Sequence, residues 1–248
     1  MNKQSNTYII GYSIVLVVVV AIVLSFTALT LKPIQQANVE VEKMSDILSS
    51  VGLYQAAEAD KAADKATFVK AEYAKYIVES FLVNDKGEKQ NADAAETFAV
   101  LNNLKAELAK PKDQITLPVF ISKNNAGKTN YVFPVYGTGL WGPIWGYIAL
   151  SDDLNTVDGV VFDHKSETPG LGAEIATPAF QGQFVNKTIF DNSTFVGIQV
   201  LKGAGSSKGN DHAVDAISGG TITSRAVQAM ILDCLDIYKP FIENQKSK

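Results

Sequence analysis

A glycine-rich segment near the end of the chain carries the first candidate chemistry. Residues 215–225 read DAISGGTITSR, and a helical pattern follows them directly. Gly219 and Gly220 lack a Cβ atom, so the backbone can approach a ligand closely or adopt a positive φ angle. Unpaired N–H groups and the dipole at a helix N-terminus favour a phosphate, which the Thr221 hydroxyl would meet. The same residues also suit an ordinary glycine turn with a threonine cap, and the pattern alone weighs the two interpretations equally.

A second candidate segment, HKSETPGLG, occupies residues 164–172. Pro169 restricts the backbone of this loop, and glycines on both sides of Leu171 leave open space beside it. A planar ring could pack there. It would pack beside Leu171, and Glu167 and Thr168 would offer polar contacts to it. Alone, this segment indicates only a turn.

Other phosphate-like and catalytic patterns are rejected. Residues 137–142, GTGLWG, match the dinucleotide-binding string, but Pro143 and a strand-like run follow where that site requires a helix. Residues 203–209, GAGSSKG, miss the spacing of a P-loop and are expected to form a flexible loop. A hydrolase triad of Ser218, His212 and an aspartate is also rejected, because the sequence around Ser218 does not form a nucleophile elbow. The chain is therefore expected to have no NADH site and no catalytic side chain.

The composition excludes several classes of function. The net charge is −4 with lysines and acidic residues interspersed, which argues against a nucleic-acid-binding surface. Cys234 is the single cysteine, so an intrachain disulfide and a site of several thiolates are ruled out. His164 and His212 are the only histidines, and no metal site is expected.

A helix is predicted directly after the glycine segment. Its apolar positions repeat with helical spacing and define one buried face. They are Val227, Met230, Ile231, Cys234, Leu235 and Tyr238. Cys234 lies within that face, so packing is its expected role. Thr223 or Ser224 is expected to cap the N-terminus of the helix, and Pro240 to end it.

An uncharged stretch near the N-terminus predicts a membrane anchor. Residues 8–31 contain no charged side chain and are long enough to cross a hydrocarbon core of ~30 Å at ~1.5 Å per residue. The apolar region of a cleaved signal peptide is usually only ~7–15 residues long, so a retained single helix is favoured. Lys3, in a short tail of residues 1–7, favours a cytoplasmic N-terminus and an exported remainder.

The remainder of the chain predicts one mixed domain. Residues 32–110 are expected to form a helical stalk and the start of the exported domain, and residues 111–248 its core. Helices are predicted over residues 56–75 and 92–110, the second stopped by Pro111. Strands are predicted in VESFLVNDKGE, TLPVFISK, NYVFPVYG, PIWGYIALS and VDGVVFDHK. The predicted fold class is α+β, with a twisted antiparallel sheet and flanking helices behind a single transmembrane helix.

The two candidate segments resemble motifs of the FMN-binding domain family. DAISGGT is similar to the family's flavinylation motif, Asp-x-x-Ser/Thr-Gly-Ala-Thr, whose last threonine carries FMN through a phosphoester bond. The resemblance implies covalent FMN on Thr221 in a motif opened by Asp215, with Gly220 where alanine is usual. HKSETPGLG is similar to the segment that lines the flavin in this family. The implied cofactor-binding residues are Thr221, Ser218, Gly219, Gly220, Thr223, Glu167, Thr168, Leu171, Gly172, Lys202 and Trp141.

Nearly the whole chain resembles the flavin-carrying subunits of the sodium-translocating NADH:quinone reductases. GTGLWGPIWGYIAL at residues 137–150, the anchor and the ILSSVGL segment carry this similarity. It implies an electron carrier that takes electrons from an iron–sulfur centre and passes them to the FMN of a neighbouring component, in a complex that reduces ubiquinone and moves sodium outward. The other subunits are the implied partners. The implied location is the bacterial inner membrane, with the flavin domain on the periplasmic side.

Several alternatives stay open. The G subunit of the related ferredoxin-linked electron transport complex shares the anchor and the flavin motif. A membrane-anchored flavin redox sensor belongs to a different class and would be expected to carry a signalling output domain. A purely structural assembly subunit would hold no flavin. Trp141 and Trp145 either wall the flavin or pack against the sheet or a partner.

Overall fold

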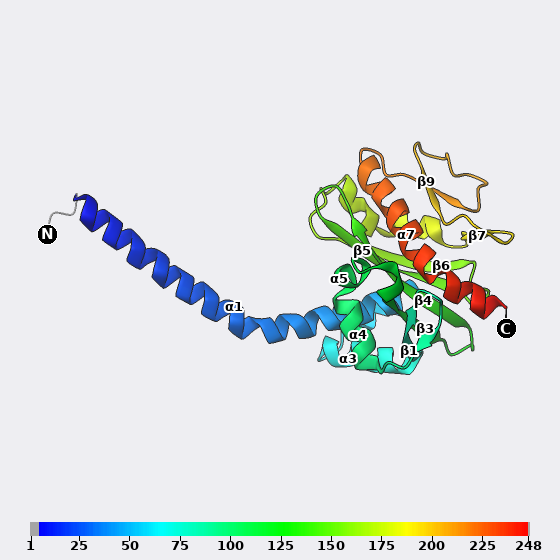
Figure 1. The fold of residues 1–248 in the computed structure, drawn as a ribbon, viewed down its shortest axis with the longest axis horizontal. Coiled ribbons are helices and arrows are strands. Elements are labelled where there is room, and N and C mark those ends of the chain that lie inside the picture. Colours follow the sequence, from blue (N-terminus) through cyan, green and yellow to red (C-terminus); the bar gives the residue numbers. More distant parts are fainter. Residues whose placement is uncertain (1–4, 248) are drawn as a thin grey trace. The chain divides into compact units, whose positions relative to one another are not determined.

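The computed structural model describes residues 5–247, and the chain divides into two compact units, residues 1–43 and 44–248. Residues 1–4 of the expected N-terminal tail, including Lys3, and Lys248 lie outside the described residues. The helices are α1 (Asn6–Ser50), α2 (Ala56–Ala59), α3 (Lys65–Tyr76), α4 (Ala94–Asn102), α5 (Leu104–Leu108), α6 (Pro178–Gln181) and α7 (Thr221–Lys246), with 3-10 turns η1 (Lys112–Gln114), η2 (Gly172–Ala176) and η3 (Gly182–Phe184). The strands are β1 (Ile77–Asn84), β2 (Lys89–Gln90), β3 (Thr116–Lys123), β4 (Thr129–Thr138), β5 (Pro143–Ser151), β6 (Val157–His164), β7 (Phe190–Asp191), β8 (Thr194–Phe195), β9 (Gln199–Leu201) and β10 (Ala213–Asp215) (Figure 1).

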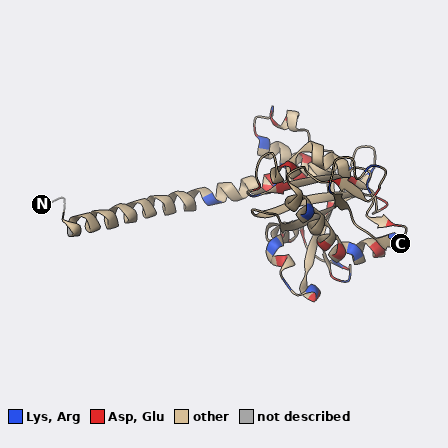
Figure 2. Ribbon diagram, turned by 90° about the horizontal axis from the view of Figure 1, so that it is seen from above, with Lys and Arg blue, Asp and Glu red and all other residues tan. Residues whose placement is uncertain are grey.

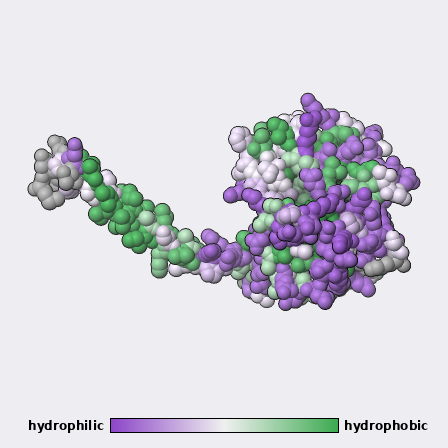
Figure 3. Space-filling view, viewed as in Figure 1, coloured by the Kyte–Doolittle hydropathy of each residue, from purple (hydrophilic) through white to green (hydrophobic). Residues whose placement is uncertain are grey.

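The first unit is the N-terminal part of α1. Residues 8–31 of this helix contain no charged side chain, and the side chains that are described there are mostly exposed. This part of the helix is tan in Figure 2 and mostly green, that is hydrophobic, in Figure 3. Within residues 5–247, α1 is the helix that is long and apolar enough to span a bilayer by length and composition. A helix that is apolar all round is expected in lipid rather than in water, which supports the predicted anchor.

The second unit is built on a six-stranded sheet with the order β2-β1-β3-β4-β5-β6. Each neighbouring pair of strands is antiparallel, so the predicted antiparallel sheet and the α+β class are confirmed. β1 pairs with β3 from Ile77 opposite Ser122 to Asn84 opposite Thr116. The sheet therefore uses chain from both sides of residue 111, where the sequence places the start of the core.

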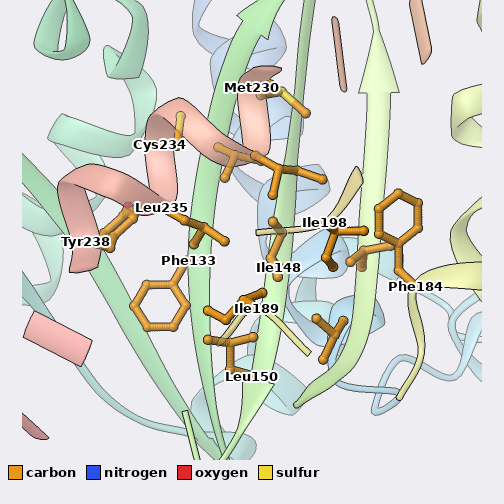
Figure 4. Packing of buried hydrophobic residues seen from close by; sticks show 14 of the residues in the cluster. Phe133, Ile148, Leu150, Phe184, Ile189, Ile198, Met230, Cys234, Leu235 and Tyr238 are labelled. Carbon is orange, nitrogen blue, oxygen red and sulfur yellow. The ribbon is translucent and has the colours of Figure 1, made fainter. Parts of the chain in front are cut away.

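Helix α7 packs on one face of this sheet. All six of its predicted apolar positions are buried, which confirms the helical period. The Tyr238 hydroxyl lies 2.9 Å from the carbonyl oxygen of Pro118 on β3 and 3.2 Å from that of Pro134 on β4. Burial raises the pKa of the Cys234 thiol to about 11, so this residue packs in the core as predicted. Figure 4 shows how the helix meets the sheet, with Met230, Cys234, Leu235 and Tyr238 above Phe133, Ile148 and Leu150.

The end of α1 and helix α4 pack on the opposite face. Successive side chains of a strand point to opposite faces, and Phe120 on β3 contacts a cluster different from that of its neighbour Val119. Ile47 at the end of α1 belongs to this second cluster and is fully buried. At Gly159 on β6 an added Cβ would lie 2.4 Å from the carbonyl oxygen of Ser50, so the end of α1 lies directly on the strand backbone.

Two predicted helices are each broken in the structure by a polar side chain. The helix expected over residues 56–75 is replaced by α2 and α3, because the Asp64 side chain accepts a hydrogen bond from the Ala66 N–H and begins a new helix. The helix expected over residues 92–110 is interrupted at Asn103. Its side-chain amide donates to the Ala99 carbonyl and competes with the backbone ladder.

The predicted ends of the last helix are both wrong. Helix α7 begins at Thr221 with Gly220 at the N-cap position, and neither Thr223 nor Ser224 caps it. Both hydroxyls are buried and bonded elsewhere, as described below. Pro240 lies inside α7, which continues to Lys246. Phe241 and Ile242 are buried beyond the proline, and their burial outweighs the hydrogen bond that a proline removes.

Removal of residues 1–31 is expected to release a soluble protein, because the uncharged apolar stretch is lost while Ile47 and Leu48 stay in the core. The measurement is its distribution between supernatant and membranes after a high-salt wash. Deletion through Ser50 is the contrasting variant. It removes two fully buried aliphatic side chains, each worth ~2–5 kcal/mol when truncated, and should leave an unstable domain. If the variant that lacks residues 1–31 stays in the membrane pellet, the protein has a second membrane contact.

Candidate functional site

A narrow cleft lies where three segments of the second unit meet. They are the turn between β4 and β5, the loop after β6 and the beginning of α7. The cleft has a volume of about 110 Å³. Its lining residues are Leu140, Trp141, Glu167, Thr168, Leu171, Gly172, Gly219, Gly220, Thr221, Ile222 and Thr223. Both candidate segments of the sequence therefore meet here, although Thr221 lies 49 positions after Gly172 in the chain.

A buried carboxylate joins the three segments. The side chain of Glu167 accepts a hydrogen bond from the Trp141 N–H at 2.7 Å through Oε1 and from the Thr223 hydroxyl at 2.6 Å through Oε2. Glu167 is only 5% exposed, and such a burial is tolerated because the charge is hydrogen-bonded. Neighbouring glycines make the room, since an added Cβ would lie 2.6 Å from Oε1 at Gly139 and 2.4 Å from Oε2 at Gly172.

The two glycines before Thr221 have different tasks. Gly219 has a φ angle of +76°, a conformation that favours glycine, and an added Cβ would lie 2.6 Å from Leu171 Cδ2. Gly220 has a φ angle of −103°, which other residues also adopt. An added Cβ at Gly220 would lie 3.0 Å from the backbone of Leu171, a close but not prohibitive approach. Gly219 therefore provides the positive φ angle and Gly220 the close approach.

The beginning of α7 offers donors that no side chain of the helix start occupies. The Gly220 N-cap forms no side-chain cap hydrogen bond, and the first turn contains no acidic residue. The Ser224 hydroxyl points the other way, donating to the Gly220 carbonyl and accepting from the Ile217 N–H. Uncapped N–H groups and the helix dipole favour an anion at this end. Thr221 lies on the cleft wall as the first residue of the helix.

Exposed apolar side chains surround the cleft. Trp141 is 65% exposed, Ile222 60%, Leu140 47% and Leu171 42%. We call these four residues the apolar rim. Large apolar side chains that gather at a small cleft typically mark a place where a ligand or partner is bound.

Two predicted site residues lie outside the cleft. Ser218 and Lys202 are exposed, and neither belongs to the cleft lining. Asp215, which opens the motif, turns away to a neighbouring loop and accepts hydrogen bonds from the N–H groups of Ser207 and Gly205. These hydrogen bonds lower the pKa of the Asp215 carboxyl. The glycine-rich loop of residues 203–209 thus binds a carboxylate of its own chain.

The two histidines and Trp145 lie outside the cleft lining. His164 Nδ1 accepts a hydrogen bond from the Glu167 N–H at 3.2 Å and so orders the loop that carries the buried carboxylate. His212 Nδ1 lies 2.7 Å from the carbonyl oxygen of Thr188, which fixes the chain before β10. Trp145 is half-buried on β5 opposite Tyr136 and does not line the cleft.

The donor set fits a ligand that joins a phosphate to a planar ring. The start of α7 supplies N–H donors and a hydroxyl for the phosphate, and the apolar rim supplies surfaces for a ring. Sites that enclose a drug-sized ligand measure roughly 300–1,000 Å³, whereas this cleft has about 110 Å³. A flavin nucleotide would therefore be held at its phosphate and lie largely over the rim.

Substitution of Leu171 by aspartate is expected to change the environment of a bound flavin while the start of α7 stays intact. Leu171 lies on the rim with its Cδ2 beside Gly219, so a carboxylate there would stand against an apolar ring. The flavin absorbance maximum or its reduction potential should shift. Val185, equally exposed but outside the cleft lining, provides the control when it is changed to aspartate. An unchanged spectrum and potential in L171D would mean that Leu171 does not face the cofactor.

The sequence analysis does not identify three residues that form the cleft or make room for the Glu167 side chain. Leu140 and Ile222 are rim residues, and Gly139 makes room for the Glu167 carboxylate. The sequence does contain a signal for Ile222. It is a large apolar residue among hydroxyl-bearing residues at the helix start, and it does not belong to the predicted buried face of the helix. No local signal marks Gly139, whose importance depends on a loop 28 residues further along the chain.

Comparisons with known proteins agree with this geometry. Residues 139–236 match the FMN-binding domain family, a range that includes both candidate segments. The chain is 34% identical to the C subunit of the Na(+)-translocating NADH-quinone reductase of Pasteurella multocida, over 91% of this chain and 88% of that protein. The corresponding protein of Vibrio campbellii is 31% identical over 92% and 89%.

Solved structures show the same relation. The crystal structure of the corresponding C subunit from Parabacteroides distasonis superposes with a TM-score of 0.71 and 36% identity, covering 86% of this chain and 96% of that one. The NqrC protein of Shewanella oneidensis superposes with a TM-score of 0.64 and 30% identity, covering 84% and 97%. The relatives and solved structures described here are all C subunits, and the match covers most of the length of each. The chain therefore belongs to the family of C subunits of the Na+-translocating NADH-quinone reductase.

Proposed function

We propose that this protein is the electron-transfer subunit of a sodium-translocating NADH:quinone reductase and carries FMN covalently on Thr221. One observation carries the proposal: Thr221 lies on the cleft wall, at an uncapped helix N-terminus and beside the apolar rim. The hydroxyl forms no hydrogen bond with any of residues 5–247, so it is free to react. The family match over residues 139–236 supports FMN as the cofactor.

The proposed attachment is a phosphoester bond. Thr221 Oγ would form a bond to the flavin-side phosphorus of a pyrophosphate-activated flavin, and its proton would pass to solvent. The P–O bond to the second phosphate would break, and that phosphate would leave with the electron pair. N–H groups at the start of α7 would hold the remaining phosphate oxygens. Glu167 keeps the three segments of the cleft in place through Trp141 and Thr223.

When bound, FMN supplies the redox chemistry, and the protein supplies attachment, orientation and surroundings. The apolar rim would orient the ring and exclude water from the face that it covers. In this proposal electrons arrive from an iron–sulfur centre and leave to the FMN of a neighbouring component of the complex.

We further propose that α1 anchors the protein in the bacterial inner membrane as a single span, with the flavin domain on the periplasmic side. The uncharged residues 8–31 support the span. A covalent bond suits a domain in that compartment, because a dissociating flavin would be lost to the surroundings. The relatives described above are C subunits, which favours this complex over the ferredoxin-linked one.

The test is ultraviolet fluorescence of the denatured full-length chain after gel electrophoresis. A noncovalent flavin leaves a denatured chain, whereas a phosphoester-bound flavin remains and gives a fluorescent band. Trypsin cleaves after Lys208 and Arg225, so the expected mass increase of FMN lies on the peptide of residues 209–225. A band without fluorescence, from protein purified from its native host, would instead favour an assembly subunit without flavin.

A further inference from the structure

The chain contains a single arginine, and it lies next to the proposed flavin attachment point. Arg225 is in the first turns of α7, four residues after Thr221. Every other basic side chain except the histidines is a lysine, so the guanidinium group is unique in this protein. Arginine differs from lysine in presenting a planar fork of donors that matches two oxygens of a phosphate.

Arg225 shares an exposed helix face with the acceptor. Residues at i and i+4 of a helix are neighbours on one face, with Cβ atoms about 5–6 Å apart. Thr221 is half-buried on the cleft wall, and Ile222 and Arg225 are exposed, while Thr223 and Ser224 are buried on the other side. Helical side chains also lean toward the N-terminus of their helix. A long side chain at Arg225 is therefore expected to lean along the surface toward Thr221.

The Arg225 guanidinium has no partner among the described residues. It forms no ion pair or hydrogen bond with any of residues 5–247. Residues 221–229 include no acidic side chain that could pair with it along the helix. A cation near a helix N-terminus is also disfavoured by the helix dipole, and the first turn carries no acidic residue to offset it. An anion placed at Thr221 would relieve both effects.

We propose that Arg225 is a phosphate-binding residue of this site, pairing with the phosphate through which FMN is joined to Thr221. The proposal rests on the proposed function, because it requires a phosphate at Thr221. A phosphate that bridges two groups keeps two free oxygens and one negative charge, which suits the fork of one guanidinium. Arg225 is a positioning residue: it holds the attached phosphate against the start of α7 and limits the motion of the flavin.

The test compares the effect of Arg225→Gln with and without flavin, in the full-length chain in a phosphate-free detergent. The chain without flavin is Thr221→Val. In that background R225Q removes an unfavourable charge from the helix start, and the melting temperature should rise by about 1–3 °C. In the flavin-bearing chain R225Q removes the phosphate partner, and the melting temperature should fall by about 2–4 °C. A change of sign between the two backgrounds is the expected result.

Two further measurements separate a phosphate contact from a general effect on the helix. The ³¹P resonance of the attached phosphate should shift in R225Q and return part of the way in R225K, which restores charge without the fork. Lys239→Gln, a change at the far end of the same helix, should alter the melting temperature equally with and without flavin.

The outcomes distinguish this proposal from the proposed function. If the wild-type chain carries flavin in the denatured band but R225Q changes the melting temperature by the same amount in both backgrounds, Arg225 is an ordinary solvated residue and the assignment is overturned. An unshifted ³¹P resonance in R225Q also overturns it. Absence of flavin from the wild-type band overturns the proposed function, and the assignment of Arg225 with it.

Discussion

Thr221→Val is expected to eliminate covalently bound flavin while the fold stays intact. Valine keeps the branched shape and removes only the oxygen that would form the phosphoester. Because the Thr221 hydroxyl has no hydrogen-bond partner among residues 5–247, its loss leaves no buried group unpaired. Valine and threonine also have similar helix propensities. Fluorescence of the denatured band should disappear, and circular dichroism should be unchanged.

Thr223→Val is the matched control, with the same change two residues further on. The Thr223 hydroxyl is buried and donates to Glu167, so it is not available for attachment. This variant should keep its covalent flavin but lose ~1–3 kcal/mol of stability, since a buried carboxylate loses one donor. Ser224 is equally unavailable, because its hydroxyl is buried and bonded to Gly220. FMN mass on Thr223 or Ser224, or a fluorescent band in T221V, would refute the assignment of Thr221.

Gly219→Ala and Gly220→Ala are expected to behave oppositely, although the two residues are adjacent. At Gly219 the φ angle of +76° costs an alanine roughly 1–2 kcal/mol, and the new methyl group would displace the Leu171 side chain. The melting temperature should fall by about 2–8 °C. Flavin attachment should fall several-fold, because the acceptor and the rim both move.

At Gly220 the backbone conformation is open to alanine. The new Cβ would lie 3.0 Å from the Leu171 backbone and the Ile217 side chain, so small shifts of a few tenths of an ångström are needed. The reduced freedom of the unfolded chain offsets that cost, and stability should stay within about 1 kcal/mol of the wild type. G220A should retain its flavin, consistent with alanine as the usual residue of the motif. The interpretation fails if G219A attaches flavin as well as wild type does while G220A does not.

The sheet was predictable because its strands carry strong local signals. TLPVFISK and PIWGYIALS are dense in β-branched and aromatic residues and coincide with β3 and β5 in the structure. The buried face of α7 was predictable for the same reason, since its period covers three turns. In both cases the pattern in the sequence directly reflects burial on one side.

Element ends were harder to predict, because there tertiary contacts outweigh local preference. Thr223 and Ser224 are residue types that often cap helices. In the structure, however, the Thr223 hydroxyl binds the Glu167 carboxylate, 56 residues earlier in the chain, and the Ser224 hydroxyl binds the Gly220 carbonyl. Pro240 has the composition of a helix end, but Phe241 is buried just beyond it. Neither partner can be read from a window of neighbouring residues.

The site divides in the same way. The glycine segment and the ETPGLG loop were identified from their own residue types, and the structure brings them to one cleft. The family resemblance implies Lys202 and Ser218 as site residues, but the structure does not place them in the cleft lining. The hydrogen bonds of Glu167 to Trp141 and Thr223 could not be predicted, because they depend on how three distant segments converge.

The buried thiol of Cys234 has a practical consequence for spectroscopy. A pKa of about 11 leaves only about one thiol in ten thousand ionised at neutral pH, and the side chain is 2% exposed. Maleimide and methanethiosulfonate reagents, which attack through the thiolate, should therefore spare it. The natural chain is thus a ready background for site-directed labelling. A single cysteine introduced on the surface could carry a spin label or fluorophore, and its distance to the flavin could be measured without first replacing a native residue.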